Sequence, residues 1–278
     1  MGALNLIFNF VGLLLWISWR SVKVEAAASA TVSLLSTLKK AEGSQGRGWP
    51  GLLFLAGLLL VRAVFYRHIG GALSWTPKLE LIAIALPFRS DHFGRIFTFS
   101  LLSFLIWLGG FYAWMLFLSV LHGKHSDEPF HRAIKQQLGV LERLPGVIKL
   151  MLVPMGAALF WVVFSRVFVR FGIMPDPGNG AHLWQQAGVV AIGSCFFFAY
   201  LWLAVLIFYL VNSYVYFGNH PFWSYVSASG RRLLWPLKWL PLQVGRVDLR
   251  PLAGIGILIA LIRGSSPWII RLYERLPL

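Results

Sequence analysis

The densest set of potential metal ligands in the chain lies within one ten-residue stretch: His122, His125, Asp127, Glu128 and His131. Imidazole and carboxylate groups bind zinc, but the spacing His-x2-His-x5-His matches no common zinc arrangement, and no cysteine is nearby. We therefore interpret this stretch as a hydrated loop and predict no bound metal. The seven histidines of the chain all fall in loops or at the ends of apolar runs, so two of them could not face one another as haem ligands. We predict no cofactor.

Sequence motifs that would indicate an enzyme are missing. The chain contains no P-loop, no Gly-x-Ser-x-Gly and no His-Glu-x-x-His. Its long apolar runs contain no acidic residue, which leaves a proton relay or a cation pathway without its usual carboxylate. We therefore predict no catalytic residue and no enzymatic activity.

Three arginines interrupt the apolar runs: Arg62, Arg166 and Arg170. An arginine at the centre of a bilayer costs about 3 kcal/mol on insertion scales, and such a residue is a candidate for a functional site. All three lie near the end of an apolar run. We therefore favour side chains that reach out to the headgroups over an ion path.

The composition explains why these runs matter. Of 278 residues, 58% are hydrophobic and 13% are charged, whereas a soluble domain carries about 25% charged residues. The single cysteine, Cys195, excludes a disulfide scaffold. The chain is therefore predicted to be a membrane protein that crosses the bilayer several times. Its net charge of +15 is better explained by anionic membrane lipids than by nucleic acid, which is not an expected partner.

A helix needs roughly 20 mostly apolar residues to span a bilayer. The sequence predicts about six such spans, with the last one extended towards residue 268, so the expected fold is an all-α membrane protein with helical hairpins and interfacial amphipathic helices. The predicted spans cover residues 1–19, 51–66, 96–123, 150–171, 187–217 and 251–262. Residues 74–88 alternate in polarity and are too short to span, so they are either re-entrant or lie on the surface.

Basic residues in the loops predict the orientation. Fifteen lysines and arginines fall in the loops 20–50, 122–149 and 218–250, against seven in the loops on the other side. By the positive-inside rule these three long basic loops are cytoplasmic and both ends of the chain are outside. Because Arg20 and Lys23 follow the first apolar run, we expect it to be a retained helix and not a cleaved signal peptide.

Two of the basic loops form an internal repeat. The segment Asp127-Glu128-Pro129-Phe130 corresponds to Asn219-His220-Pro221-Phe222, and Leu144-Pro145 corresponds to Trp235-Pro236. Proline stops a helix at the preceding residue. Residues 130–144 then predict an interfacial helix, with Phe130, Ile134, Leu138 and Leu141 on one apolar stripe. In the second copy we expect aromatic anchors at Trp223, Tyr225, Trp235 and Trp239, and lipid-facing charges at Arg231, Arg232 and Lys238.

These motifs resemble those of the YggT (YlmG) family of small bacterial inner-membrane proteins. The likeness rests on Asn219-His220-Pro221-Phe222, on Leu234-Trp235-Pro236-Leu237-Lys238 and on the segment from Leu240 to Pro251, with its Gly-x-x-Asp-x-x-Pro ending. It implies a first, weaker repeat at residues 96–171 and a second at 187–264. A divergent helical pair with the re-entrant or interfacial segment (1–95) precedes them, and an interfacial tail (265–278) follows.

The resemblance implies a non-enzymatic protein of the bacterial inner membrane, a scaffold or assembly factor in envelope organisation or cell division. Its partners would be anionic lipids and other membrane proteins, or a second copy of the chain. The alternative is a small transporter or channel, since internal repeats are common in such folds. The family positions carried over, structural or partner-binding in role, are Pro129, Phe130, Pro145, Asn219, Pro221, Phe222, Pro236, Gly245, Asp248 and Pro251.

Asp248 and Gly245 occur at the point where the chain re-enters the membrane. Asp248 is expected to cap the helix that opens near Pro251, with a contact to Arg231 or Arg232, or a partner site, as alternatives. Gly245 could adopt the positive φ of a tight turn. The first repeat lacks this step, so we expect Glu142→Ala to have no effect.

Overall fold

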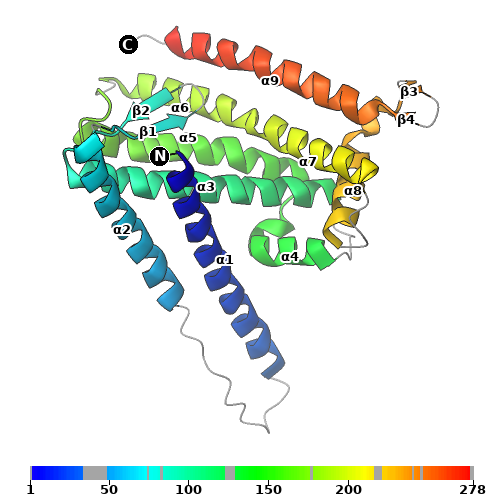
Figure 1. Cartoon of the computed structure of the whole chain (residues 1–278), viewed down its shortest axis with the longest axis horizontal. Helices are drawn as coiled ribbons and strands as arrows, with labels where there is room; N and C mark the ends of the chain where they lie inside the picture. Colours follow the sequence, from blue (N-terminus) through cyan, green and yellow to red (C-terminus); the bar gives the residue numbers. More distant parts are fainter. Residues whose placement is uncertain are drawn as a thin grey trace. The chain divides into compact units, whose positions relative to one another are not determined.

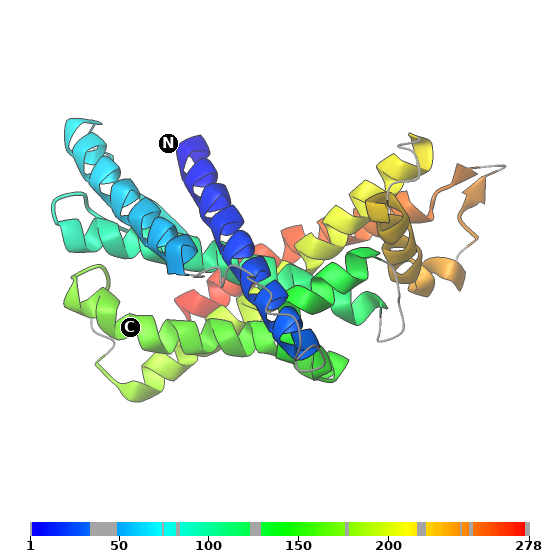
Figure 2. The same cartoon turned by 90° about the horizontal axis from the view of Figure 1, so that it is seen from below.

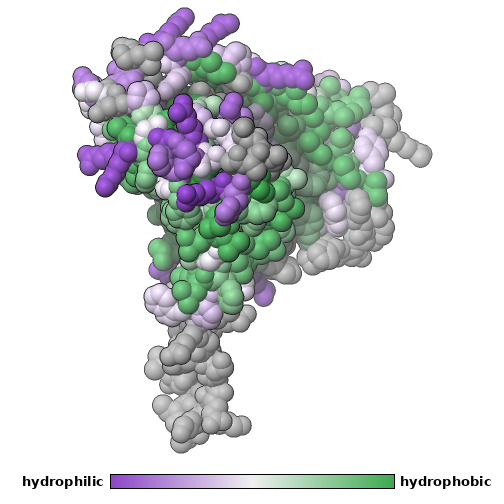
Figure 3. All heavy atoms as spheres, turned by 60° about the vertical axis from the view of Figure 1, so that its left-hand side comes forward, coloured by the Kyte–Doolittle hydropathy of each residue, from purple (hydrophilic) through white to green (hydrophobic). Residues whose placement is uncertain are grey.

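The computed structural model describes residues 2–33, 49–73, 75–81, 84–122, 129–175, 178–215, 221–239, 241–244 and 247–275. Nearly all of them are helical. Six segments are long and apolar enough to cross a membrane: Gly2–Ser21, Trp49–Gly70, Phe93–His122, Gly146–Arg170, Gly180–Tyr214 and Arg250–Glu274. The prediction of an all-α membrane protein with six spans is confirmed. Hydrophobic side chains (green) cover much of the face shown in Figure 3, as expected for helices that contact lipid.

The chain forms two units, of which the first contains residues 1–79 and 86–111. Helix α1 (Gly2–Ser33) packs along α2 (Trp49–Leu73), and α3 (Phe93–His122) begins in the same unit (Figure 1). Leu55, Leu59 and Phe104 form its apolar core. Gly12 allows α1 to approach closely, because a Cβ atom there would lie 2.9 Å from the Phe104 ring.

The segment between α2 and α3 is a β-hairpin of β1 (Lys78–Leu81) and β2 (Ile84–Pro87). Leu79, Ile84 and Leu86 are buried, and their strand neighbours are more exposed. The alternating polarity therefore reflects two short paired strands. The sequence alone did not distinguish a re-entrant segment from a segment on the surface. Phe88 follows the hairpin and donates its backbone N–H to the carbonyl of Pro77 at 2.8 Å.

The second unit contains residues 80–85 and 112–278. Helix α5 (Gly146–Arg170) packs on α6 (Gly180–Cys195), and α7 (Phe197–Tyr214) packs on α9 (Arg250–Glu274). The span predicted at 187–217 begins earlier, at Gly180, and is interrupted at Phe196. The last span continues through Arg263 as predicted. Residues 265–274 continue α9 without a break, and their predicted place at the membrane interface stays a prediction.

Two short helices with 3-10 extensions connect these long helices. They are α4 (Pro129–Leu138) with η1 (Gly139–Arg143), and α8 (Pro221–Leu233) with η2 (Trp235–Trp239). Ile134 and Leu138 are buried in one core with Leu206, Leu233 and further apolar residues of this unit. Ile134 and Leu138 of the predicted stripe therefore contact protein, where we expected lipid. The reason is that α8 packs against α4 and supplies the apolar surface that the stripe covers.

A small ribbon precedes α9. Strands β3 (Gln243–Val244) and β4 (Val247–Asp248) pair antiparallel, with Gln243 opposite Asp248 and Val244 opposite Val247. The ribbon lies at the end of the group formed by α7, α8 and α9 (Figure 2). Leu249, after the ribbon, donates its N–H to the carbonyl of Leu242 at 2.9 Å. This bond holds the base of the ribbon together just where α9 begins.

Candidate functional site

The prolines of the repeat lie where helices begin. Pro129 and Pro221 are the first residues of α4 and α8, Pro145 is the N-cap of α5, and Pro251 is the second residue of α9; Pro236 is the second residue of η2. Proline is tolerated in the first turn because the N–H that it lacks would have no helical partner there. These positions therefore set helix boundaries.

The remaining family positions are not gathered at one place. Phe130 lies in α4, and Phe222 lies in α8, where its ring centroid is 6.4 Å from that of Phe208 in α7. Asn219 and Gly245 fall outside the described residues. The positive φ expected at Gly245 therefore stays a prediction.

Asp248 acts at the start of α9. Its Oδ1 accepts a hydrogen bond from the backbone N–H of Arg250 at 2.9 Å and lies 3.9 Å from Arg250 Nε. The first backbone N–H groups of a helix have no partner within the helix, and an aspartate oxygen can accept one of them. The contact agrees with the capping interpretation, although the N-cap residue itself is Leu249.

We expect Asp248→Ala to lower the free energy of unfolding by about 1 kcal/mol, the usual cost of losing a helix cap. Denaturation of the purified protein in detergent measures this. Asn179→Ala is a matched control, because Asn179 is the N-cap of α6 and its Oδ1 accepts from the N–H of Ala181 at 3.1 Å. If Asp248→Ala accumulates normally in the membrane but behaves like a deletion strain, a partner contact replaces the capping role.

The basic and aromatic residues of the second repeat separate into a buried and an exposed set. Tyr225 is only 1% exposed, so the prediction that it anchors at the headgroups is wrong. The exposed set, which we name the α8–η2 surface residues, consists of Arg231, Arg232, Trp235, Lys238 and Trp239. Arg232 also donates to the carbonyl of Leu121. Five large basic or aromatic side chains are thus presented outward by helices that are themselves packed on protein.

Two of the three histidines in the candidate metal segment are buried. His122 and His131 are both buried, with ring centroids 5.8 Å apart, so the interpretation as a hydrated loop is wrong for these two residues. The His122 ring stacks on Tyr225 at 3.8 Å, and its Nε2 lies 3.5 Å from Ser229 Oγ. Among the described residues no three ligand side chains gather at a metal-binding distance; His125, Asp127 and Glu128 fall outside them.

A buried ion pair joins η1 to the start of α5, and Ser119 near the end of α3 bonds to both of its members. Lys149 Nζ donates to Glu142 Oε2 at 2.8 Å and to Ser119 Oγ at 2.7 Å, and the Ser119 hydroxyl donates to the same carboxylate oxygen. Lys149 is only 4% exposed. No pattern in the sequence indicates this pair, because Pro145 separates its members and breaks the helical spacing that could have related them.

Arg62 is fully buried in the first unit, so the prediction that it reaches the headgroups is wrong. Its Nη1 donates to Asn9 Oδ1 at 2.7 Å, and its Nη2 donates to Asn5 Oδ1. Asn9 in turn donates to Ser103 Oγ at 3.0 Å. A usable signal was present: Asn5 and Asn9 are four residues apart and therefore place two amides on one face of an otherwise apolar helix.

Arg166 and Arg170 differ from Arg62. Both are exposed on α5, and Arg170 is the last residue of that helix. Gly172 follows with φ of 61° and ends the helix, with the N–H of Ile173 bonded to the carbonyl of Phe168 at 2.8 Å. The exposure of Arg166 and Arg170 is compatible with contact between their side chains and lipid headgroups. That contact stays a prediction.

Six apolar spans define the class of this molecule: it is an integral membrane protein that crosses the bilayer several times. Comparison with known protein families, with curated proteins and with solved structures found no match.

Proposed function

We propose that this chain is a non-enzymatic scaffold or assembly factor of YggT type in the bacterial inner membrane, acting in envelope organisation or cell division. It would hold membrane partners and anionic lipid at its cytoplasmic side. The excess of basic residues in alternate loops supports this orientation. The missing enzyme motifs support a role without an enzymatic reaction.

One observation supports the proposal: the α8–η2 surface residues are exposed, whereas neighbouring apolar residues of the same segment are buried in the second unit. Val226, Leu233 and Leu234 are buried in the second unit, while Trp235 and Trp239 are 67% and 87% exposed. Exposed tryptophans beside arginines and lysines are typical of sites that sit at the headgroup level or bind another protein. Because these neighbouring residues are packed, little ordering is required when such a surface binds.

We expect the triple variant Arg231→Gln, Arg232→Gln, Lys238→Gln to bind anionic lipid more weakly, by about 1 kcal/mol for each charge near the membrane surface. The full-length protein in detergent is titrated with phosphatidylglycerol and, for comparison, with phosphatidylcholine. High salt should weaken binding of the wild type in the same direction.

The matched control is the double variant Arg67→Gln, Arg89→Gln, which removes two exposed arginines on the predicted non-cytoplasmic side. Affinity capture from native membranes with the same variants then tests the protein partners. If the triple variant retains both the lipid and every captured partner, the α8–η2 surface residues do not carry the function.

The second candidate function is a small transporter or channel. The observation that favours it is the buried polar network of Arg62, Asn5 and Asn9 within predicted spans, since intramembrane polar groups often mark substrate paths. Reconstitution in liposomes separates the two candidates, because a scaffold gives no flux of ions or solutes.

A further inference from the structure

The positive charge of Arg62 lacks a negative counterpart within the part of the chain that the structure describes. Its hydrogen-bond acceptors are neutral: the amide oxygens of Asn5 and Asn9 and the carbonyl of Ser100, 3.5 Å from Nη1. Its Nε is buried without an acceptor. Burying an unpaired charge is strongly unfavourable, and residues that do so inside a membrane are usually functional.

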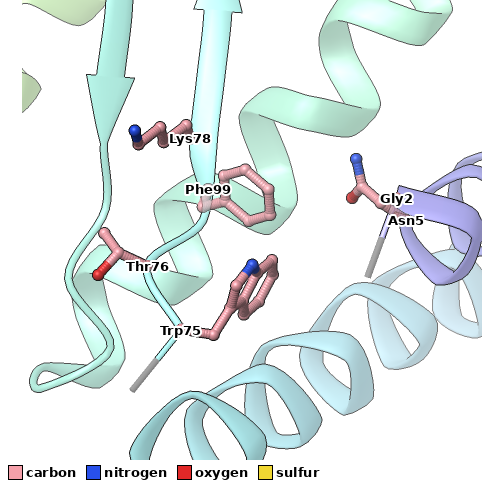
Figure 4. A pocket seen from close by; sticks show the side chains of 6 residues that line it. All are labelled: Gly2, Asn5, Trp75, Thr76, Lys78 and Phe99. Carbon is pink, nitrogen blue, oxygen red and sulfur yellow. The ribbon is translucent and has the colours of Figure 1, made fainter. Parts of the chain in front are cut away.

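A cavity of about 380 Å³ adjoins this arginine in the first unit. Its lining consists of Gly2, Asn5, Trp75, Thr76, Lys78 and Phe99 (Figure 4). Asn5 accepts a hydrogen bond from Arg62, and the Phe99 ring lies 5.6 Å from the guanidinium carbon. Arg62 therefore lies immediately behind two of the residues that form the wall.

The cavity also offers donors of its own. Lys78 from β1 and Thr76 from the preceding segment stand on one side in Figure 4, Asn5 of α1 stands on the other, and the rings of Trp75 and Phe99 lie between them. None of the lining residues is acidic. An ammonium group is a common ligand of phosphate, and the nearby guanidinium adds to the positive potential of the cavity.

We propose that this cavity binds the phosphate group of an anionic ligand, carried either by a lipid headgroup or by a free small molecule. Lys78 and Thr76 would contact the phosphate directly. Arg62, which lies behind the lining residues Asn5 and Phe99, would help to neutralise the negative charge of the phosphate without contacting it. The volume falls within the range of about 300–1,000 Å³ that is usual for small-molecule sites. This inference concerns the first unit and is independent of the α8–η2 surface residues.

The position of Trp75 supports a preformed site. The backbone N–H of Trp75 donates to the carbonyl of Gly70 at 3.2 Å. Its ring packs edge-on against the Tyr66 ring, with the two centroids 5.2 Å apart. Gly70 is required at that point, because a Cβ atom there would lie 2.5 Å from Ser90 Cβ. Trp75 is thus held in place by α2, whether or not a ligand is present.

Calorimetric titration of the full-length, delipidated protein tests the proposal with three probes: inorganic phosphate, short-chain phosphatidylglycerol and short-chain phosphatidylcholine. We expect Lys78→Gln and Arg62→Gln each to weaken binding of the anionic probe by about tenfold, as loss of one charge contact would do. Arg67→Gln is the matched control, since it removes an exposed arginine of the same unit that does not line the cavity, and it should bind like the wild type.

The outcomes distinguish the sources of the phosphate. Binding of inorganic phosphate indicates a free ligand, and binding of phosphatidylglycerol alone indicates a lipid headgroup. The proposal is overturned if neither anion binds, if phosphatidylcholine binds as tightly as phosphatidylglycerol, or if Lys78→Gln binds like the wild type. The result for Lys78→Gln tests the proposal even if Arg62→Gln fails to accumulate, because Lys78 is exposed and replacing an exposed side chain usually changes stability little.

Discussion

Lys149→Met lowers the free energy of unfolding by about 3–5 kcal/mol, because it leaves the Glu142 carboxylate largely buried without its cation. The pair is close, at 2.8 Å, and Ser119 bonds to both members. Denaturant titration in detergent measures the loss. Arg143→Gln is the matched control, since Arg143 neighbours Glu142 in η1 and is exposed.

The double variant Lys149→Met, Glu142→Gln should recover most of that loss, because replacing both ions leaves no uncompensated charge. A double variant as unstable as Lys149→Met alone would show that packing around Lys149, and not its charge, stabilises this region. The expectation that Glu142→Ala has no effect cannot be kept, since that change removes the partner of a buried lysine.

The same pair has a pH dependence whose sign follows from its contacts. Burial opposes ionisation of Glu142, but hydrogen bonds from Lys149 and Ser119 and the Lys149 charge outweigh it and lower the pKa of the carboxyl. A lowered pKa contributes stability that is present above the unfolded-state value and is lost as pH falls through the folded-state value. The wild type should therefore lose stability on acidification below about pH 4.5, and the double variant should lose less.

Gly230→Ala destabilises the contact between α8 and α7, by about 1–3 kcal/mol as is usual for overpacking. A Cβ atom at Gly230 would lie 2.4 Å from Cγ and 2.6 Å from Cβ of Tyr209. Neither atom is the free end of a flexible side chain, so one helix must shift. The melting temperature of the purified protein reports the effect.

Gly256→Ala in α9 is the control for Gly230→Ala, because no atom lies within 4 Å of the added carbon. It should be neutral or stabilise the helix by up to about 1 kcal/mol. Equal melting temperatures for the two variants would contradict the close approach of α8 to α7.

The sequence predicts the spans well because hydropathy and length are local properties. Residues 96–123 were expected as a span, and α3 runs from Phe93 to His122. The repeat prolines likewise lie at helix starts, since proline acts through the backbone of its own turn. The residue type alone was sufficient in both cases.

The polar face of Asn5 and Asn9 is visible in the sequence, but which distant residue pairs with it could not be predicted. Arg62 looked like a headgroup contact because hydropathy averages a window and does not reveal that Asn5 and Asn9, on another helix, face it. His122 and Tyr225 are separated by more than a hundred residues, yet their rings stack. Buried polar contacts of this kind depend on how helices pack, and packing is not encoded in any short window.

The long apolar segment formed by α6 and α7 has a consequence for the surrounding bilayer. Its 35 residues extend about 52 Å at about 1.5 Å per residue, whereas a hydrocarbon core is about 30 Å thick. Neighbouring α5 has only 25 residues. Hydrophobic mismatch on this scale is relieved by tilt, by the interruption at Phe196 or by local thickening of the membrane, each at a fraction of a kcal/mol per Å. Acyl-chain length thereby becomes a variable that sets the stability of the protein and the membranes in which it accumulates.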